Sequence, residues 1–231
     1  MNSAEILTDV KAIFRAAWKR SPGIKVPDIE RVALTGNQGI ELDGTVLYAD
    51  MADSTKLVES YKDEFAAEIY KAYLLSACRI INGEGGAITA FDGDRVMAVF
   101  VGDRKNTQAA TSALKINFIV KEINTAIRGQ YPNSSFTLAQ CVGIDTSPLL
   151  VAKTGIRDNN DLVWVGTAAN HAAKLSSLNE PGYPSFITEP VYKKLADAAK
   201  FGGTPRVDMW EKRTWTATGR TIYRSSYWWS F

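Results

Sequence analysis

The sequence predicts an α+β fold in which helices pack around a mainly antiparallel sheet, in the split β-α-β or ferredoxin-like arrangement. The first observation is the order of elements, which reads strand, helix, strand, strand, helix, strand. The second is the tight Asp92-Gly93 turn, which joins the two middle strands into an antiparallel hairpin. With 231 residues, 45% of them hydrophobic and 23% charged, the chain has the composition of an ordinary globular protein.

The spacing of apolar residues places each element of this unit. An apolar run that ends at Asp50 predicts the first strand. Apolar side chains that recur every three or four residues predict two long helices, over about 54–81 and 106–127, and glycine follows each. The remaining strands are predicted near 87–91, 95–101 and 135–144. Further on, we expect a strand near 185–188, a helix over about 190–200, and a final hairpin from 210–215 and 219–229.

The N-terminal segment forms a unit of its own in this interpretation. Residues 2–20 have the pattern of an amphipathic helix that ends at Ser21-Pro22-Gly23, and packing on the domain or on a second subunit is favoured over a membrane surface. Residues 22–43 contain several glycines and prolines and read as a connection with at most one short strand. We therefore expect an N-terminal helix and connecting segment over 1–43 and a catalytic domain over 44–231.

Composition excludes several classes of protein. The net charge of +2 does not indicate binding to nucleic acid or to an acidic membrane. Cys78 and Cys141 lie far apart and lack metal-ligand spacing, which is typical of a reduced, cytoplasmic protein. No stretch has the roughly 18 apolar residues of a membrane span, so we expect no stable membrane association.

The stretch from Gly44 to Thr55 carries the first functional motif. Asp50 ends an apolar strand and is followed at once by the helix-start residues Asp53, Ser54 and Thr55. Backbone N–H groups at a helix start attract phosphate, and a carboxylate beside them can bind a divalent cation that the same phosphates share. The motif therefore predicts a phosphate and metal site. The alternative is that an aspartate here only caps the next helix.

A second carboxylate, Asp94, is predicted at the tip of the hairpin. If the strand that ends in Asp50 lies beside this hairpin, Asp50 and Asp94 can clamp one or two metal ions. Two ions about 3.5–4 Å apart would stabilise the attacking and leaving oxygens of a phosphoryl displacement. The alternative is that Asp-Gly is present only for the turn.

The third motif lies on a helix that begins at Gly166-Thr167. Asn170 and Lys174 are four residues apart and so share a face, where an amide and an ammonium can hold a ribose oxygen and phosphate charge. A solvated helix face is the alternative. His171, the only histidine, points about 100° away from Asn170, and a surface or packing role is favoured over general-base catalysis.

In this order, the three motifs resemble those of the class III nucleotidyl cyclases, over roughly Gly44 to Leu178. The resemblance implies a head-to-tail homodimer that turns a nucleoside triphosphate into a 3′,5′-cyclic monophosphate and pyrophosphate, with two Mn²⁺ or Mg²⁺ ions per site. Asp50 and Asp94 would bind the metal ions in one subunit, and Asn170 and Lys174 would come from the other. The backbone of Met51, Ala52, Asp53, Ser54 and Thr55 would hold the distal phosphates.

The departures from the family pattern concern the base. Lys174 stands where Arg is usual, and the two purine-reading positions are occupied by Ala90 and Val163. The chain therefore resembles the bacterial pyrimidine cyclases of the Pycsar anti-phage system, which implies UTP as substrate, CTP second, and a separate effector protein that senses the product. Tyr48 and Phe91 are candidate base contacts, although packing between adjacent strands is the favoured interpretation.

The C-terminal hairpin supplies the last candidate. In the family a basic residue of this region reaches the triphosphate, which points here to Arg220, with Lys212 or Arg213 as alternatives. An exposed edge-strand cation is the structural alternative. Two other functions stay open: an adenylate cyclase that reads adenine through backbone groups, and a degenerate cyclase domain that only binds nucleotide. The acceptor of the 3′-hydroxyl proton also stays open.

Overall fold

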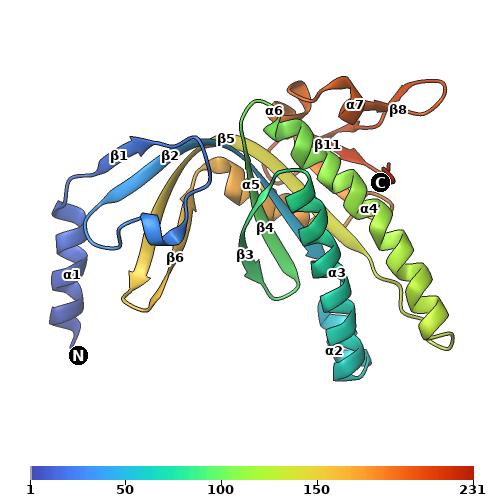
Figure 1. Ribbon diagram of the computed structural model, residues 1–231, viewed down its shortest axis with the longest axis horizontal. Coiled ribbons are helices and arrows are strands. Elements are labelled where there is room, and N and C mark those ends of the chain that lie inside the picture. Colours follow the sequence, from blue (N-terminus) through green and yellow to red (C-terminus); the bar gives the residue numbers. More distant parts are fainter. Residues whose placement is uncertain (1) are drawn as a thin grey trace.

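The computed structural model describes residues 2–231, and its central sheet contains the predicted unit. Four antiparallel strands lie side by side in the order β5-β2-β4-β3. Their bounds are β2 Gln38–Met51, β3 Ala87–Asp92, β4 Arg95–Val101 and β5 Gln140–Ile156. The helices α3 (Asp63–Gly83) and α4 (Lys105–Gln130) connect them and lie next to each other in Figure 1. The split β-α-β arrangement is confirmed.

The sheet continues beyond β5. There β7 (Ser185–Thr188) pairs with β5 in parallel, and the hairpin of β10 (Glu211–Trp215) and β11 (Arg220–Ser225) completes that edge. Elsewhere β6 (Asn159–Val165) pairs with the far half of β5, and β1 (Lys19–Pro22) pairs in parallel with the start of β2. A separate two-stranded ribbon joins β8 (Phe201–Gly202) and β9 (Val207–Asp208).

Helices cover both faces of this sheet, because α5 (Thr167–Ser176) lies opposite α3 and α4. Along β2, Leu47, Ala49 and Met51 belong to the large core cluster that includes residues of α3 and α4. Val46, on the other face of the strand, belongs to a smaller cluster that includes alanines of α5. Successive side chains of β2 point to opposite faces of the sheet, so this one strand contributes to both hydrophobic cores. The prediction of helices around a mainly antiparallel sheet is confirmed: α3 and α4 share one face, and α5 covers the other.

Gly143 allows α5 to rest directly on β5. A Cβ atom at this position would lie 2.2 Å from the carbonyl oxygen of Ala172 and 2.4 Å from the amide nitrogen of Ser176. No side chain fits at these distances, so glycine is what permits the close contact between helix and strand. The position of α5 on the sheet is fixed by this contact.

Several predicted bounds are wrong for identifiable reasons. The helix predicted over 54–81 is two helices, α2 (Ser54–Ser60) and α3, since the backbone is extended at Tyr61 and Lys62. Asp63 and Glu64 favour a new helix start there. The strand predicted from 135 begins at Gln140, because the Asn124 side chain bonds both backbone groups of Leu138. The helix predicted over 190–200 is divided into α6 (Glu189–Lys193) and α7 (Asp197–Lys200).

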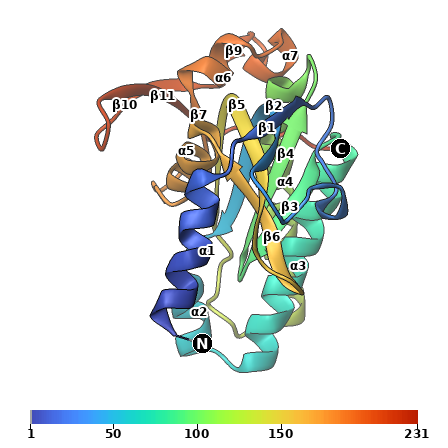
Figure 2. The ribbon, with the colours of Figure 1, turned by 90° about the vertical axis from the view of Figure 1, so that its left-hand side faces the viewer.

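The N-terminal segment is partly integrated into the sheet. Helix α1 (Ser3–Arg15) is shorter than predicted, and the residues after it form β1 and a 3₁₀ turn, η1 (Ile29–Arg31). Because β2 begins at Gln38, the central strand reaches back before residue 44. The division of the chain at residue 44 stays a prediction. Figure 2 shows α1 at one side of the molecule, beside the sheet edge that carries β1. Within residues 2–231, no helix is long and apolar enough to cross a membrane.

Candidate active site

The two predicted metal ligands meet at one end of the sheet. Asp50 is the penultimate residue of β2 and lies opposite Arg95 in the register with β4. The turn between β3 and β4 is tight, with Gly93 at a φ of +61°, and it carries Asp94 to the same end. Both aspartates line a pocket of about 680 Å³. The expectation that the hairpin lies beside the strand ending at Asp50 is confirmed.

The electrostatics of this pocket favour a bound cation. Burial and, next, the negative charge of Asp94 raise the pKa of Asp50 to about 6, while Arg95 opposes this shift. The Oδ2 atom of Asp94 is buried and has no hydrogen-bond partner. A divalent cation between the two carboxylates would relieve their repulsion and satisfy this oxygen. The two residues therefore fit a metal ion of the Mg²⁺ or Mn²⁺ type.

The protein supplies only part of a coordination shell. Across the described chain, residues 2–231, no group of three or more His, Cys, Asp or Glu side chains is placed to hold a metal ion. Magnesium is commonly held by one or two carboxylates together with substrate phosphates and water. The acid pair thus matches a metal ion that arrives with a phosphorylated substrate.

The raised pKa of Asp50 predicts that Asp50→Asn stabilises the metal-free protein. Between about pH 4 and pH 6 the unfolded chain loses this proton and the folded chain keeps it, so stability falls as the pH rises through this window. The full shift would amount to about 3 kcal/mol, which solvent screening of the half-buried group reduces to about 1 kcal/mol. At pH 7.5 with chelator, thermal unfolding should show a higher Tm for Asp50→Asn.

The matched control for this stability prediction is Asp92→Asn. The Asp92 side chain is 77% exposed and forms an ion pair of 2.7 Å with Arg95. Removing its charge should therefore not raise the Tm. An unchanged or lower Tm for Asp50→Asn would show that the acid pair does not strain the metal-free fold.

The helix-start residues lie where the first motif predicts. Asp53, Ser54 and Thr55 line the same pocket as the acid pair, and Asp53 adopts a left-handed backbone conformation with φ at 58°. Met51 also lines the pocket. Ala52 does not, and its N–H group donates to the carbonyl oxygen of Ala139 at 2.9 Å. Its amide is therefore already paired in the metal-free protein.

Four residues of this pocket were not predicted from the sequence: Lys56, Glu59, Arg95 and Asn179. Arg95 lies opposite Asp50, pairs with Asp92, and places its guanidinium 5.3 Å from the centroid of the Tyr48 ring. The signal for Arg95 was available, because the residue directly after a two-residue hairpin turn faces the end of the neighbouring strand. Asn179 comes from a loop that is distant in sequence, and no local sequence pattern predicts that it lines this pocket.

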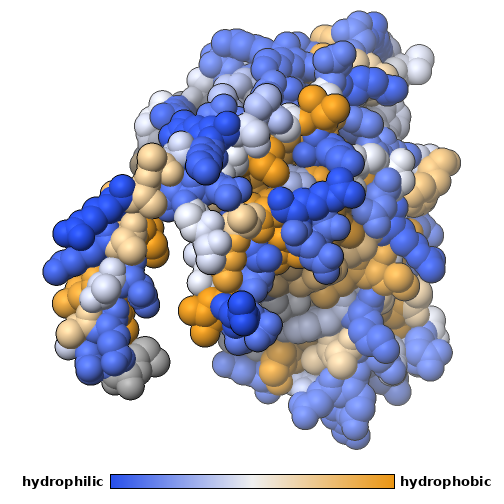
Figure 3. Space-filling view, turned by 60° about the vertical axis from the view of Figure 1, so that its left-hand side comes forward, coloured by the Kyte–Doolittle hydropathy of each residue, from blue (hydrophilic) through white to orange (hydrophobic). Residues whose placement is uncertain are grey.

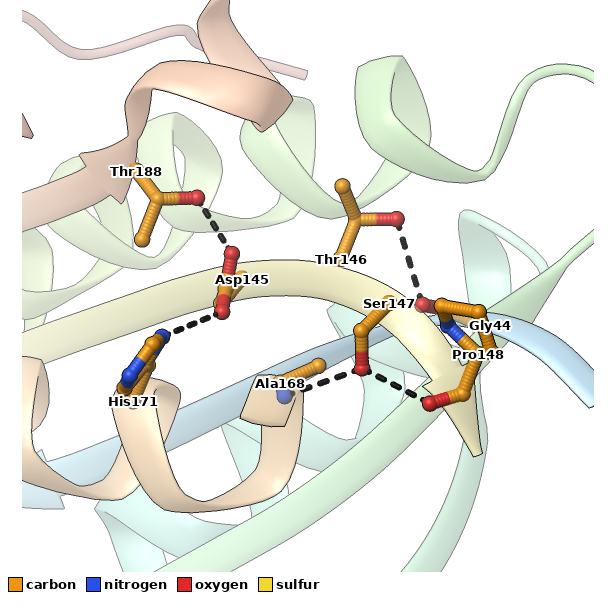
Figure 4. Close-up of polar contacts among 8 residues, drawn as sticks. All are labelled: Gly44, Asp145, Thr146, Ser147, Pro148, Ala168, His171 and Thr188. Atoms are coloured by element: carbon orange, nitrogen blue, oxygen red, sulfur yellow. Dashed lines mark hydrogen bonds and ion pairs between the residues drawn. The ribbon is translucent and has the colours of Figure 1, made fainter. Parts of the chain in front are cut away.

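Asn170 and Lys174 are both exposed on α5, and neither lines the pocket of the acid pair. A neighbouring side of α5 is held by a polar cluster, drawn in Figure 4. His171 Nδ1 lies 2.8 Å from Asp145 Oδ2, and the hydroxyl of Thr188 donates to the other oxygen of the same carboxylate. These contacts orient the helix so that Asn170 and Lys174 face away from the sheet.

His171 has a packing role in this arrangement, as predicted. Its ring also meets the Trp215 ring edge to face, with centroids 5.5 Å apart. At the start of α5, the Ser147 hydroxyl accepts a hydrogen bond of 3.1 Å from the N–H of Ala168 (Figure 4). The helix is thereby tied to β5 at both its first turn and its middle.

The four candidate base contacts do not share one face of the sheet: Tyr48 and Ala90 lie on the α5 side, and the strand register places Phe91 and Val163 on the other. Tyr48 and Ala90 are partly buried against the smaller core cluster. Phe91 is 59% exposed and Val163 is 40% exposed. Packing between strands therefore describes Tyr48 but is wrong for Phe91, since the outermost strand β3 leaves one of its faces uncovered there.

Arg220 is the basic residue of the C-terminal hairpin that lies next to α5. It lines a cavity of about 400 Å³ together with His171, Thr167 and Trp215. Of the two alternatives, Arg213 forms an ion pair of 3.0 Å with Glu211, and neither Lys212 nor Arg213 lines this cavity. The assignment of Arg220 to phosphate stays a prediction.

Comparison with solved structures shows what the fold of this chain resembles. The crystal structure of the adenylyl cyclase CyaB from P. aeruginosa superposes with a TM-score of 0.68 at 21% identity and covers 80% of this chain and 94% of that one. At this identity the likeness shows the fold, which is that of a class III nucleotide cyclase domain. No family model matches the chain.

Comparison with characterised proteins defines the family. The uridylate cyclase of Xanthomonas perforans is 51% identical over 227 residues, which are 97% of this chain and 96% of that protein. The uridylate cyclase of Burkholderia cepacia is 47% identical over 218 residues, which are 94% and 93% of the two chains. The chain belongs to the uridylate cyclase family, and it is a nucleotide cyclase.

Proposed function

We propose that this protein converts UTP into 3′,5′-cyclic UMP and pyrophosphate and that it depends on Mg²⁺ or Mn²⁺. The observation that carries the proposal is the acid pair of Asp50 and Asp94, which shares one pocket with the helix start at Asp53. Relatives at 51% and 47% identity that are named uridylate cyclases support the choice of UTP. CTP is the second candidate, followed by ATP.

The reaction forms a bond between the ribose 3′-oxygen and the α-phosphorus and breaks the bond between this phosphorus and the pyrophosphate oxygen. Mg²⁺ or Mn²⁺, when bound at the acid pair, would supply positive charge to both the attacking and the leaving oxygens. Asp50 and Asp94 hold this charge at the α-phosphate, and the segment Asp53 to Thr55 positions the distal phosphates.

The remaining groups would come from a second copy of the chain. Asn170 and Lys174 are exposed on α5 and lie outside the pocket of the acid pair, so one copy alone leaves them without a substrate to contact. In a homodimer, Asn170 would hold the ribose and Lys174 would neutralise charge that grows on the phosphate. Arg220, whose cavity adjoins α5, would add a second cation.

The proposal of a pyrimidine base depends on the absence of hydrogen-bonding side chains at the two positions that read the base. Ala90 and Val163 have no hydrogen-bonding group in their side chains, so their side chains cannot read the edge of a purine. The Tyr48 ring, which shares its face of the sheet with Ala90, can pack against a smaller base, whereas the exposed Phe91 ring lies on the other face.

The test of the proposal is separate incubation of the purified protein with UTP, CTP, ATP and GTP in the presence of Mn²⁺, with products identified by mass spectrometry. Cyclic UMP from UTP, formed at least about tenfold faster than any other product, is the expected result. A preference for ATP would mean that the absence of side-chain readers at positions 90 and 163 does not exclude adenine. If no triphosphate gives a product, the proposed activity is wrong and a domain that only binds nucleotide is the remaining interpretation.

We also propose that the product serves as a second messenger in bacterial defence against phages, acting in the cytoplasm on a separately encoded effector. The resemblance to the Pycsar pyrimidine cyclases supports this role. In cells that carry the effector, wild-type protein should restrict phage growth and the Asp50→Asn variant should not. If the wild type and the Asp50→Asn variant restrict phage growth equally, the defence role does not depend on formation of the cyclic nucleotide.

A further inference from the structure

Helix α1 is a well-formed helix that its own chain leaves uncovered. Asn2 and Glu5 form a capping box at its start, and at its end the side-chain amide of Asn37 donates to the carbonyl oxygens of Ile13 and Ala16 at 2.8 and 2.7 Å. These caps fix both ends of the helix and its direction relative to β2. Nevertheless, no residue of α1 is buried.

The uncovered surface of α1 includes a complete apolar face. Ile6, Val10 and Ile13 recur at intervals of four and three residues, and Leu7 and Phe14 widen this stripe. Phe14 is 82% exposed, and Ile6, Leu7 and Ile13 are each at least half exposed. Figure 3 shows the helix as an arm that stands clear of the body, with an open gap between the two and with hydrophobic surface on the arm.

Such an arrangement needs a cover. Isolated helices of this length are marginal in water, and most helical stability in proteins comes from packing of the apolar face. The exposed large apolar residues also form a contiguous stripe rather than single scattered side chains, which marks an interaction surface. The charge of the helix disfavours a membrane, because Glu5 and Asp9 balance Lys11 and Arg15.

We propose that a second copy of this chain covers the apolar face of α1, so that the N-terminal helix forms part of the homodimer interface. This inference rests on the proposed function in one respect, since the divided site already requires a second copy. Other exposed apolar side chains, on β3 and on the β5–β6 hairpin, need the same cover: Phe91, Ile156, Val163 and Val165. A single two-fold partner can bury both sets, since its interface uses the same patches on both copies.

The test compares two aspartate substitutions in the full chain. Phe14→Asp places a charge on the apolar face of α1, and Ala12→Asp places the same charge on the polar face of the same helix. Sedimentation velocity over a dilution series should show a dimer dissociation constant at least about tenfold higher for Phe14→Asp. The value for Ala12→Asp should stay within about twofold of the wild type.

Equal dissociation constants for the two variants would overturn the inference. So would binding of wild-type protein to vesicles of anionic phospholipid that Phe14→Asp abolishes without changing the dimer, because α1 would then face a membrane. The measurement needs no nucleotide, so it separates this inference from the proposed activity. A wild-type protein that makes no cyclic nucleotide but dimerises through Phe14 would contradict the proposed function alone.

Discussion

Replacing either Asp50 or Asp94 by Asn should lower the rate of cyclic UMP formation by at least about a thousandfold. Each substitution keeps the size of the side chain and removes one of the two carboxylates that face each other in the pocket. The remaining carboxylate would hold a divalent cation at the α-phosphate more weakly and in a less defined position, so the charge that develops in the reaction is less well compensated. The rate is measured at saturating UTP and Mn²⁺.

Two features of the molecule make this prediction sharp. Asp50→Asn is expected to be more stable than the wild type without metal, so its loss of activity cannot be ascribed to unfolding. Asp92→Asn, two residues before Asp94 in the same hairpin, should retain at least about a third of the activity because its exposed carboxylate pairs with Arg95. Activity in either pocket variant within tenfold of the wild type would remove the acid pair from the mechanism.

Replacing Lys174 by Ala should lower kcat by at least about a hundredfold, the effect of removing one donor from a developing phosphate charge. Lys174 is exposed on α5 and lies outside the acid pocket, so a structural effect on that pocket is not expected. Lys174→Arg restores a positive charge with a planar fork and should recover most of the rate.

The form of the loss separates a catalytic role from a binding role. If Lys174 acts on the transition state, kcat falls and the KM for UTP changes little. Lys193→Ala removes a lysine of α6 that is paired with Glu189 at 3.2 Å and should not change either constant. An unchanged kcat for Lys174→Ala would contradict a catalytic role for Lys174.

The parts of the site that were predictable from the sequence are those set by local chemistry. The hairpin turn next to Asp92, the strands on either side of it and the helix start at Ser54 each depend on a few adjacent residues. The two turn residues are Gly93 and Asp94, one position later than predicted, and Asp94 lies at the hairpin tip as predicted. The meeting of Asp50 with Asp94 then required only that their strands be neighbours, which the split β-α-β order provides.

The parts that were missed depend on contacts between distant segments. The close approach of α5 to β5 requires Gly143, and nothing around this residue indicates which helix will lie on it. Strand β6 was not predicted, because it begins with Asn-Asn-Asp, residue types that are depleted in strands. The break between α2 and α3 also went unseen, since the apolar spacing continues across it. In each case the tertiary contact overrides the local pattern.

The most direct test of this account is cyclic UMP formation by a mixture of two inactive variants, Asp50→Ala and Lys174→Ala. If each site takes its acid pair from one copy and its lysine from the other, half of the dimers in an equal mixture are mixed, and each mixed dimer contains one intact site. The mixture should therefore regain about one quarter of the wild-type specific activity. No gain over the separate variants after subunit exchange would contradict the divided site.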